Sequence, residues 1–169
     1  MHTVQKKVCL LGDFAVGKTS LIRRFVEGRF DDKYLSTIGV KISRKTLERE
    51  DHRLNLLIWD LAGGDDFSKA SANYLRGAAG ALLVCDLTRA ETLITLTDYA
   101  QQLRAMDETA VLILVGNKAD LLDERQISDE ALATVAETFA APYLLTSALT
   151  GHHVEDAFYH LAEAIETLP

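Results

Sequence analysis

The sequence predicts an α/β fold built on a mostly parallel, doubly wound sheet. Short apolar runs alternate with longer stretches whose apolar residues recur at helical spacing, which is the pattern of repeated strand–helix units. Right-handed crossovers between such units place helices on both faces of the sheet. The 169 residues contain no repeat, low-complexity segment or linker, so residues 1–169 are expected to form a single domain.

Six runs are expected to form strands. Compact apolar runs are typical of strands that are covered on both faces of a sheet. They span residues 8–11, 54–59, 82–85, 110–115 and 143–145. Residues 40–47 instead alternate between apolar and polar side chains, which suits an edge strand, and the polar residues 49–52 predict a hairpin turn after it.

Four amphipathic helices are expected between these strands. Their apolar stripes consist of Leu21, Ile22, Phe25 and Val26; of Leu93, Leu96, Ala100 and Leu103; of Leu132, Val135, Ala136 and Phe139; and of Val154, Ala157, Phe158, Leu161 and Ile165. Ser128, followed by two acidic residues, favours a helix start because its hydroxyl can accept a hydrogen bond from a free backbone N–H.

Composition disfavours several classes of protein. The net charge of −7 disfavours a broad surface for nucleic acid or an anionic membrane. Cys9 and Cys85 lie in apolar runs, so they are expected to be buried thiols in a reducing compartment. No apolar run approaches the roughly 18 residues that span a bilayer, and neither end carries a signal peptide or a lipidation motif. We expect a cytoplasmic protein without a membrane anchor of its own.

A phosphate-binding loop is predicted at residues 12–19, which match the pattern G-x-x-x-x-G-K-[ST] between an apolar strand and an amphipathic helix. Backbone N–H groups of such a loop hold nucleotide phosphates. Lys18 would reach the β- and γ-phosphates, and the Thr19 hydroxyl would bind Mg²⁺. The alternative is a chance glycine turn with a solvated lysine. The residues expected to contact phosphate are Gly12, Asp13, Phe14, Ala15, Val16, Gly17, Lys18, Thr19 and Ser20.

A second motif predicts that the base is guanine. Asn117, Lys118 and Asp120 follow an apolar strand, at the edge where open parallel sheets bind ligands. The Asp120 carboxylate can accept from N1–H and the 2-amino group of guanine, whereas adenine would leave a buried charge unpaired. The segment containing Ser147 and Ala148 follows a later strand and would add a backbone N–H to guanine O6. The motif disfavours an ATP-using kinase.

With these motifs in order, the chain resembles small GTPases of the Ras superfamily, and within them the Rab branch. The similarity rests on Gly12 and Asp13, on residues 34–40 and on residues 58–60, and it spans essentially the whole chain. It implies a P-loop NTPase G domain, with a six-stranded, mostly parallel sheet, one antiparallel edge strand and about five helices. It also implies two nucleotide-dependent switch segments. A prokaryotic Rab-like protein and a chain whose lipidated tail was removed both remain open.

The resemblance implies roles for several residues near the γ-phosphate. Thr37 would complete the Mg²⁺ sphere through its hydroxyl and bind the γ-phosphate through its N–H. Asp60 would hold a Mg²⁺-bound water, and the Gly63 N–H would contact the γ-phosphate. With Lys18 and the position of Gly64, Thr37 and Gly63 form the expected catalytic set.

The resemblance also implies contacts around the base and the phosphates. Phe30 would pack against the base, Tyr34 would cover the phosphates, and the stem of Lys118 would lie along the nucleotide. Ordinary core or surface aromatics are the alternative for Phe30 and Tyr34. Leu149 stands where the base-contacting loop often has lysine, which affects the expected affinity and not the identity of the base.

Two departures from the family predict slow hydrolysis. Gly64 replaces the glutamine that orients the attacking water, and glycine has no side chain to do so. Phe14 stands where relatives mostly carry Gly or Ser, on the path of an activator's arginine. Asp65 and Asp66 lie nearby, but carboxylates would repel the γ-phosphate, so a solvated loop or a helix start is the favoured interpretation.

Two functional hypotheses follow from these expectations. The first is a monomeric Mg²⁺-dependent GTP/GDP switch with slow hydrolysis, which binds an effector through switch I around Thr37 and switch II at residues 63–75. Exchange factors and activating proteins would regulate it. The second is a non-hydrolysing, GTP-dependent interaction module. A metal site at His152, His153 and His160 is disfavoured because the sequence provides no further ligands for it.

Overall fold

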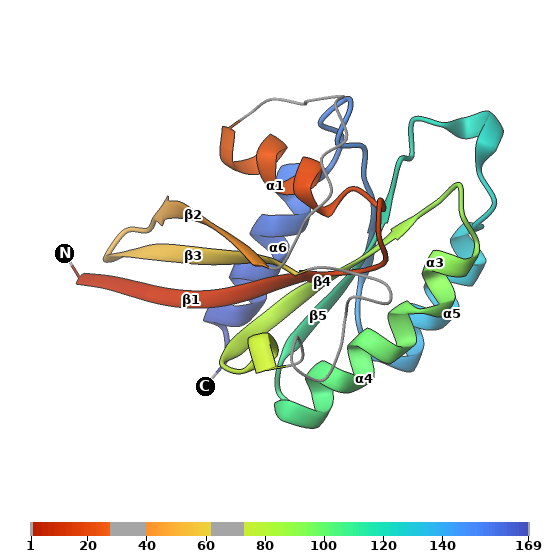
Figure 1. Cartoon of the computed structure of the whole chain (residues 1–169). Helices are drawn as coiled ribbons and strands as arrows, with labels where there is room; N and C mark the ends of the chain where they lie inside the picture. Colours follow the sequence, from red (N-terminus) through yellow and green to blue (C-terminus); the bar gives the residue numbers. More distant parts are fainter. Residues whose placement is uncertain (1, 28–39, 62–72, 169) are drawn as a thin grey trace.

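The computed structural model describes residues 2–27, 40–61 and 73–168, and these residues form a six-stranded sheet with helices on both faces (Figure 1). The strand order is β2-β3-β1-β4-β5-β6. β2 pairs antiparallel with β3, and every other neighbouring pair is parallel. The expected mostly parallel sheet with one antiparallel edge strand is therefore confirmed.

The described elements run in the order β1 (His2–Leu11), α1 (Lys18–Glu27), β2 (Val40–Glu48), β3 (His52–Leu61), β4 (Ala78–Asp86), α3 (Glu91–Ile94), α4 (Leu96–Met106), β5 (Val111–Asn117), α5 (Asp129–Thr138), β6 (Tyr143–Leu145) and α6 (Val154–Glu166). Single 3₁₀ turns lie at Asn73–Leu75 and Leu122–Glu124. The expectation of about five helices agrees with the five α-helical segments of the described residues.

The side chains of the central strands point alternately to the two covered faces of the sheet, which explains why these strands are apolar throughout. Val8 and Leu10 of β1 pack into the core under α1 and α6, whereas Cys9 and Leu11 pack into the core under α4 and α5. Successive side chains of a strand point to opposite faces, so a strand covered on both faces needs apolar residues at every position. Figure 1 shows the two helical layers on either side of the sheet.

Three strands begin earlier than their apolar runs predict; β3 starts at His52, two residues before its run, and β1 and β4 start earlier still. β1 starts at His2 because its polar first half pairs residue by residue with β3, beginning opposite His52. β4 starts at Ala78 and includes Gly80, where an added Cβ would lie 2.7 Å from the Val111 carbonyl oxygen. Close approach of a neighbouring strand, rather than strand propensity, favours a small residue there.

The predicted helices are present in the structure, but one of them is divided into two segments. The stripe that begins at Leu93 belongs to two consecutive segments, α3 and α4, which meet at Thr95. Ser128 caps α5 as expected, since its Oγ accepts a hydrogen bond from the Ala131 N–H at 3.1 Å.

A polar clamp joins the β2–β3 hairpin to the end of α6. The Arg49 guanidinium donates to Glu166 Oε1 at 2.7 and 2.9 Å, and the His52 ring lies 2.9 Å from Glu166 Oε2 and 2.6 Å from Asp51. The hydrogen bonds with Asp51 and Glu166 raise the pKa of His52. Partial burial alone would raise the pKa of Glu166, but the bonds from Arg49 and His52 hold it below its ordinary value.

Both cysteines are fully buried free thiols, as expected from their apolar surroundings. Burial raises the pKa of each thiol to about 12.

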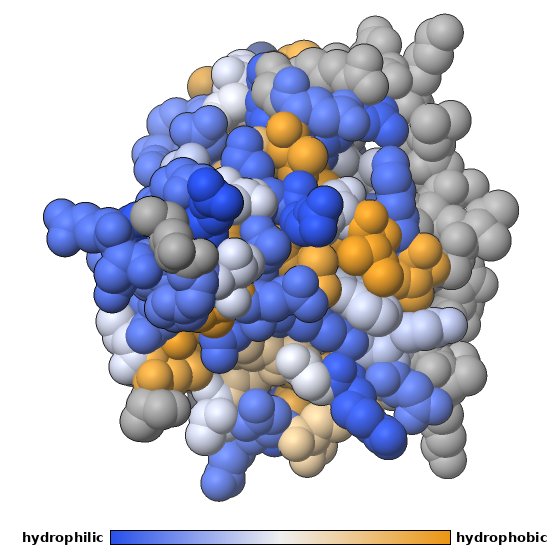
Figure 2. Space-filling view, turned by 90° about the vertical axis from the view of Figure 1, so that its left-hand side faces the viewer, coloured by the Kyte–Doolittle hydropathy of each residue, from blue (hydrophilic) through white to orange (hydrophobic). Residues whose placement is uncertain are grey.

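Among the described helices, none is long and apolar enough to cross a membrane. Figure 2 shows the side of the molecule that carries the β2–β3 hairpin, where hydrophilic side chains separate small apolar groups.

Candidate functional site

A tight loop connects the carboxyl end of β1 to α1 and includes the predicted phosphate-binding residues. Two glycines make its close packing possible. A Cβ on Gly12 would lie 2.3 Å from the Val84 carbonyl oxygen, and one on Gly17, whose φ is +106°, would lie 2.3 Å from Asn117 Nδ2. The loop therefore rests against β4 and the end of β5, and side chains at these two positions would push it away.

Lys18 is a buried cation inside this loop. Only 7% of the residue is exposed, and its Nζ donates to the carbonyl oxygens of Gly12 at 3.0 Å and Asp13 at 3.2 Å. Burial lowers the pKa of Lys18, while the nearby carboxylates of Asp60 and Asp13 oppose that shift. The loop thus holds an ammonium group at its centre, where an anion can pair with it.

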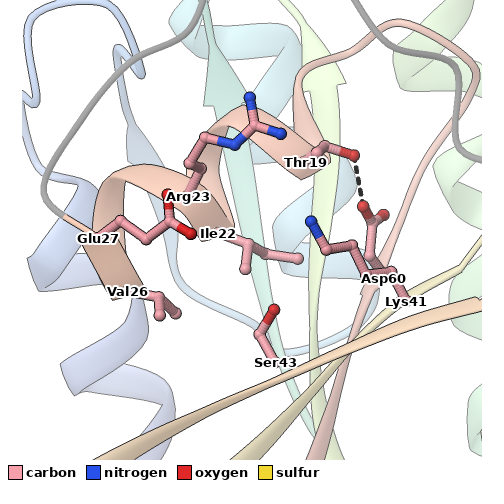
Figure 3. A pocket seen from close by; sticks show the side chains of 8 residues that line it. All are labelled: Thr19, Ile22, Arg23, Val26, Glu27, Lys41, Ser43 and Asp60. Carbon is pink, nitrogen blue, oxygen red and sulfur yellow. Dashed lines mark hydrogen bonds between the residues drawn. The ribbon is translucent and has the colours of Figure 1, made fainter.

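Thr19, in the first turn of α1, meets the end of β3. Its hydroxyl donates to Asp60 Oδ2 at 2.5 Å, and Asp60 is 1% exposed. Figure 3 shows this bond at one end of a pocket between α1 and the β2–β3 strands. The contact brings together two oxygen-bearing side chains from positions 41 residues apart.

Asn117 connects the phosphate loop to the later base-motif segment. Its Nδ2 donates to the Val16 carbonyl oxygen at 3.0 Å. Its Oδ1 accepts from the Thr146 hydroxyl at 3.0 Å and from the Ala148 N–H at 3.3 Å. Asn117 is 2% exposed, so each of these bonds satisfies a buried polar group.

The other two members of the base motif are also held by specific contacts. Lys118 has a φ of +69° and places its Nζ 2.8 Å from Asp86 Oδ2 and 3.2 Å from the Ala15 carbonyl oxygen. The Ser147 hydroxyl donates to Asp120 Oδ1 at 2.7 Å. The motif predicted at residues 117–120 and the segment 146–148 therefore lie side by side.

Several supporting residues were not identified from the sequence. The Thr95 hydroxyl donates to Asp13 Oδ2 at 2.7 Å, and the Tyr99 hydroxyl donates to Asp13 Oδ1 at 3.2 Å. Arg89 Nη1 donates to the Phe14 carbonyl oxygen at 2.9 Å. Thr95 lies between α3 and α4, Tyr99 lies on α4, and Arg89 lies in the turn before α3. No local pattern relates these residues to a loop more than 70 residues earlier.

Two further residues support the site, and the sequence could have indicated only one of them. Asp86 ends β4 directly opposite Asn117, so a polar residue after a buried strand could have identified it. Arg24 of α1 donates to the carbonyl oxygens of Ala148, at 3.1 Å, and Leu149. Nothing in the spacing of the α1 residues indicates that bond.

Comparison with known proteins identifies the family. A sequence model of the Ras family matches residues 7–167. The chain belongs to the Ras family. It is 39% identical to Ras-related protein Rab-10 of Caenorhabditis elegans, over 94% of this chain and 80% of that protein. It is 40% identical to Ras-related protein RABA4b of Arabidopsis thaliana, over 94% of this chain and 71% of the relative. Human Ras-related protein Rab-22A is 36% identical, over 94% of this chain and 82% of its own length.

This Ras-family chain is Rab-like, and its family establishes it as a GTP-binding small GTPase that acts as a switch. Phe30, Tyr34 and Thr37 lie outside the described residues, as do Gly63 and Gly64 with Asp65 and Asp66. The expectations for these seven positions therefore stay predictions.

Three other positions of the Ras-family chain can be placed. Phe14 and Leu149 are about half exposed, at 49% and 52%. His153 stands at the N-terminus of α6, with its ring Nδ1 3.1 Å from the Leu145 carbonyl oxygen. Within the described ranges, no group of three metal-ligating side chains is found, at the histidines or elsewhere.

Proposed function

We propose that this chain is a Mg²⁺-dependent GTP/GDP switch with slow intrinsic hydrolysis, which binds effectors through switch I around Thr37 and switch II at residues 63–75. The observation that carries the proposal is the position of Asn117, which bonds both the phosphate loop and the segment after β6. One side chain thereby fixes the distance between the predicted phosphate and base sites. A nucleotide needs both sites at a set separation.

Phosphate binding is assigned to the loop around the buried ammonium group. Gly12 to Ser20 provide backbone N–H groups and the N-terminus of α1, and Lys18 provides the charge. Lys18 now donates to two loop carbonyls at 3.0 and 3.2 Å, and phosphate oxygens would take over those bonds. Charge-assisted bonds to phosphate are the stronger ones.

Guanine binding is assigned to Asp120, Lys118 and the Ser147–Ala148 segment. Ser147 holds Asp120 Oδ1 at 2.7 Å, which orients the carboxylate that would accept from the base. The Ala148 N–H donates to Asn117 over a long 3.3 Å bond, and guanine O6 would be a second acceptor for it. Leu149, at 52% exposure, would flank the base.

The site fits Mg²⁺ by the chemistry of its donors. Thr19 and Asp60 present hydroxyl and carboxylate oxygens in direct contact, and Mg²⁺ takes oxygen ligands. Thr19 and the switch residue Thr37 would bind the ion directly, and Asp60 would hold one of its waters. The ion would neutralise phosphate charge and tie the nucleotide to the protein.

The proposal of slow hydrolysis rests on residue chemistry. Gly64 provides no amide to orient water for in-line attack, which costs about 1–3 kcal/mol of barrier, or roughly ten- to a hundredfold in rate. Arg89 donates to the Phe14 carbonyl, and Phe14, a residue of the phosphate loop, is about half exposed. Its ring would hinder an arginine supplied by an activating protein. An activator that supplies its own glutamine would bypass Gly64.

Partners and location complete the proposal. An exchange factor would release GDP, and an activating protein would speed hydrolysis. Effectors would bind only one of the two nucleotide states. We assign the switch to a reducing compartment, the cytoplasm, because its two thiols are buried and free. It would act as a monomer.

The assignment of the base is tested by Asp120→Asn. Xanthine carries a carbonyl where guanine carries its 2-amino group, so the variant should exchange affinity for GDP for affinity for XDP. The exposed Asp123→Asn, which removes the same charge three residues away, is the matched control and should keep GDP preference. Unchanged GDP affinity of Asp120→Asn in a competition titration would overturn the assignment.

The second candidate, a non-hydrolysing module, is separated from the switch by single-turnover cleavage of bound GTP. Slow cleavage that Gly64→Gln accelerates supports the switch with Gly64 as a cause. If Phe14→Gly accelerates cleavage and Gly64→Gln does not, Phe14 is the dominant obstacle. Fast cleavage by the unchanged protein contradicts both assignments, and no cleavage over many hours favours the module.

A further inference from the structure

The pocket between α1 and β2 contains a cation beside the predicted magnesium site. Thr19 and Asp60 form one end of this pocket, and Lys41 of β2 enters it from the side (Figure 3). Lys41 has no role in the proposed nucleotide contacts. Its position next to the Asp60 carboxylate nevertheless gives it a direct electrostatic relation to any ion bound there.

The strand register fixes this position. Lys41 of β2 is the cross-strand partner of Asp60 in the antiparallel β2–β3 pair. Residues directly opposite one another in such a pair project to the same face, with Cβ atoms about 4.5–5.5 Å apart. Figure 3 shows the Lys41 side chain alongside Asp60, with its ammonium group directed into the pocket toward α1.

Asp60 and Lys41 differ in burial, which determines how strongly their charges interact. Asp60 is 1% exposed and its Oδ2 accepts from Thr19, whereas Lys41 is exposed and lies opposite Asp60 on the edge strand β2. A buried carboxylate requires a counter-charge. Lys18 supplies part of this charge from the phosphate loop. The Lys41 ammonium and Mg²⁺ are both suited to supply the rest, but these two cations repel each other.

We propose that Lys41 is a positioning residue that acts through Asp60 to weaken Mg²⁺ binding and so sets how readily the nucleotide is released. The inference rests on the proposed Mg²⁺-dependent function. With the ion bound, Lys41 is repelled from the carboxylate. When the ion leaves, Lys41 compensates Asp60, which stabilises the ion-free state through which nucleotide is exchanged.

The expected size of the effect follows from Coulomb's law. One unit charge at several ångströms from a divalent ion, in solvent-exposed surroundings of high dielectric constant, changes the affinity for the ion about three- to tenfold. Salt screens this interaction because Lys41 is exposed, so the effect should shrink between about 0.05 M and 0.5 M NaCl.

Three variants distinguish the effect of the Lys41 charge from the effect of changing the side chain itself. Lys41→Met removes the charge and keeps the length of the side chain, and Lys41→Arg keeps the charge. Lys45→Met removes the same charge from the same face of β2, opposite Leu56 and about 13 Å farther along the strand. Melting temperatures of all three would show that the β2 edge still folds.

The measurement is the release rate of fluorescent GDP as a function of free Mg²⁺. Lys41→Met should reach half-maximal slowing at a three- to tenfold lower Mg²⁺ concentration than the unchanged protein, and this difference should fall at high salt. Lys41→Arg and Lys45→Met should behave like the unchanged protein. Equal Mg²⁺ dependence of Lys41→Met and the unchanged protein, or equal shifts in Lys41→Met and Lys41→Arg, would overturn the inference.

The same titration separates this inference from the proposed function. If the unchanged protein binds GDP and releases it at a rate independent of Mg²⁺, the Mg²⁺-dependent switch itself is wrong. If its release depends on Mg²⁺ and only the Lys41→Met shift is missing, the switch stands and the role of Lys41 is wrong.

Discussion

Replacing Asn117 by Ala should destabilise the nucleotide-free protein by about 3–6 kcal/mol. The change removes three hydrogen bonds, to the Val16 carbonyl, the Thr146 hydroxyl and the Ala148 N–H. Each buried group left without a partner costs about 1–3 kcal/mol. The lower half of that range applies, because a water can enter the space that the carboxamide leaves. Such a loss is a large fraction of the 5–15 kcal/mol by which domains are typically stable.

Urea unfolding of the nucleotide-free protein measures this change. Thr146→Val removes one of the three bonds at nearly constant volume and should cost about 1 kcal/mol. The double variant should cost less than the sum of the two single changes, because the Thr146 hydroxyl has already lost its acceptor in Asn117→Ala. GDP affinity should fall in Asn117→Ala, since the phosphate loop and the base-motif segment lose their connection.

Either of two results would contradict a connecting role of Asn117. A cost below about 1 kcal/mol for Asn117→Ala would mean that the three contacts do not hold the loops together. Additive costs in the double variant would mean that Asn117 and Thr146 act independently. An unchanged denaturant dependence of the unfolding free energy would confirm that each variant alters stability and not the compactness of the unfolded chain.

Gly17→Ala should cost about 2 kcal/mol or more of stability and weaken GDP binding, because its Cβ would lie 2.3 Å from Asn117 Nδ2. Gly77→Ala, also at positive φ but in open space, should cost less, and equal urea midpoints would contradict this. Tyr99→Phe should cost about 1 kcal/mol and weaken GDP binding slightly, since Asp13 loses one of its donors; unchanged unfolding and GDP titrations would contradict this. Hydrogen bonds raise the pKa of His52, so its stabilising effect is complete below pH 6.5 and disappears as the pH rises through the raised value. The difference in melting temperature between the unchanged protein and His52→Gln should therefore close at alkaline pH, and a constant difference from pH 5.5 to 9 would count against it.

The local pattern of the chain determined the class of fold and the residues of the candidate site. Apolar runs and helical stripes depend on the period of a single element, and this period can be read without knowing the element's neighbours. The motifs at residues 12–19 and 117–120 are equally local, because each is one loop after one strand. Their common location at the sheet edge also followed, since parallel strands end at the same edge.

Tertiary structure alone decided the contacts between elements. The Asn117 bond to Val16 joins residues 101 positions apart, and the Thr95 bond to Asp13 joins residues 82 apart. The early starts of β1 and β4, outside any apolar run, depend in the same way on partner strands. The opposition of Lys41 and Asp60 depends on the register of β2 against β3. A shift of one residue in that register would turn Lys41 to the other face, because side chains alternate along a strand. Register is a relation between two strands, and neither strand's own sequence contains it.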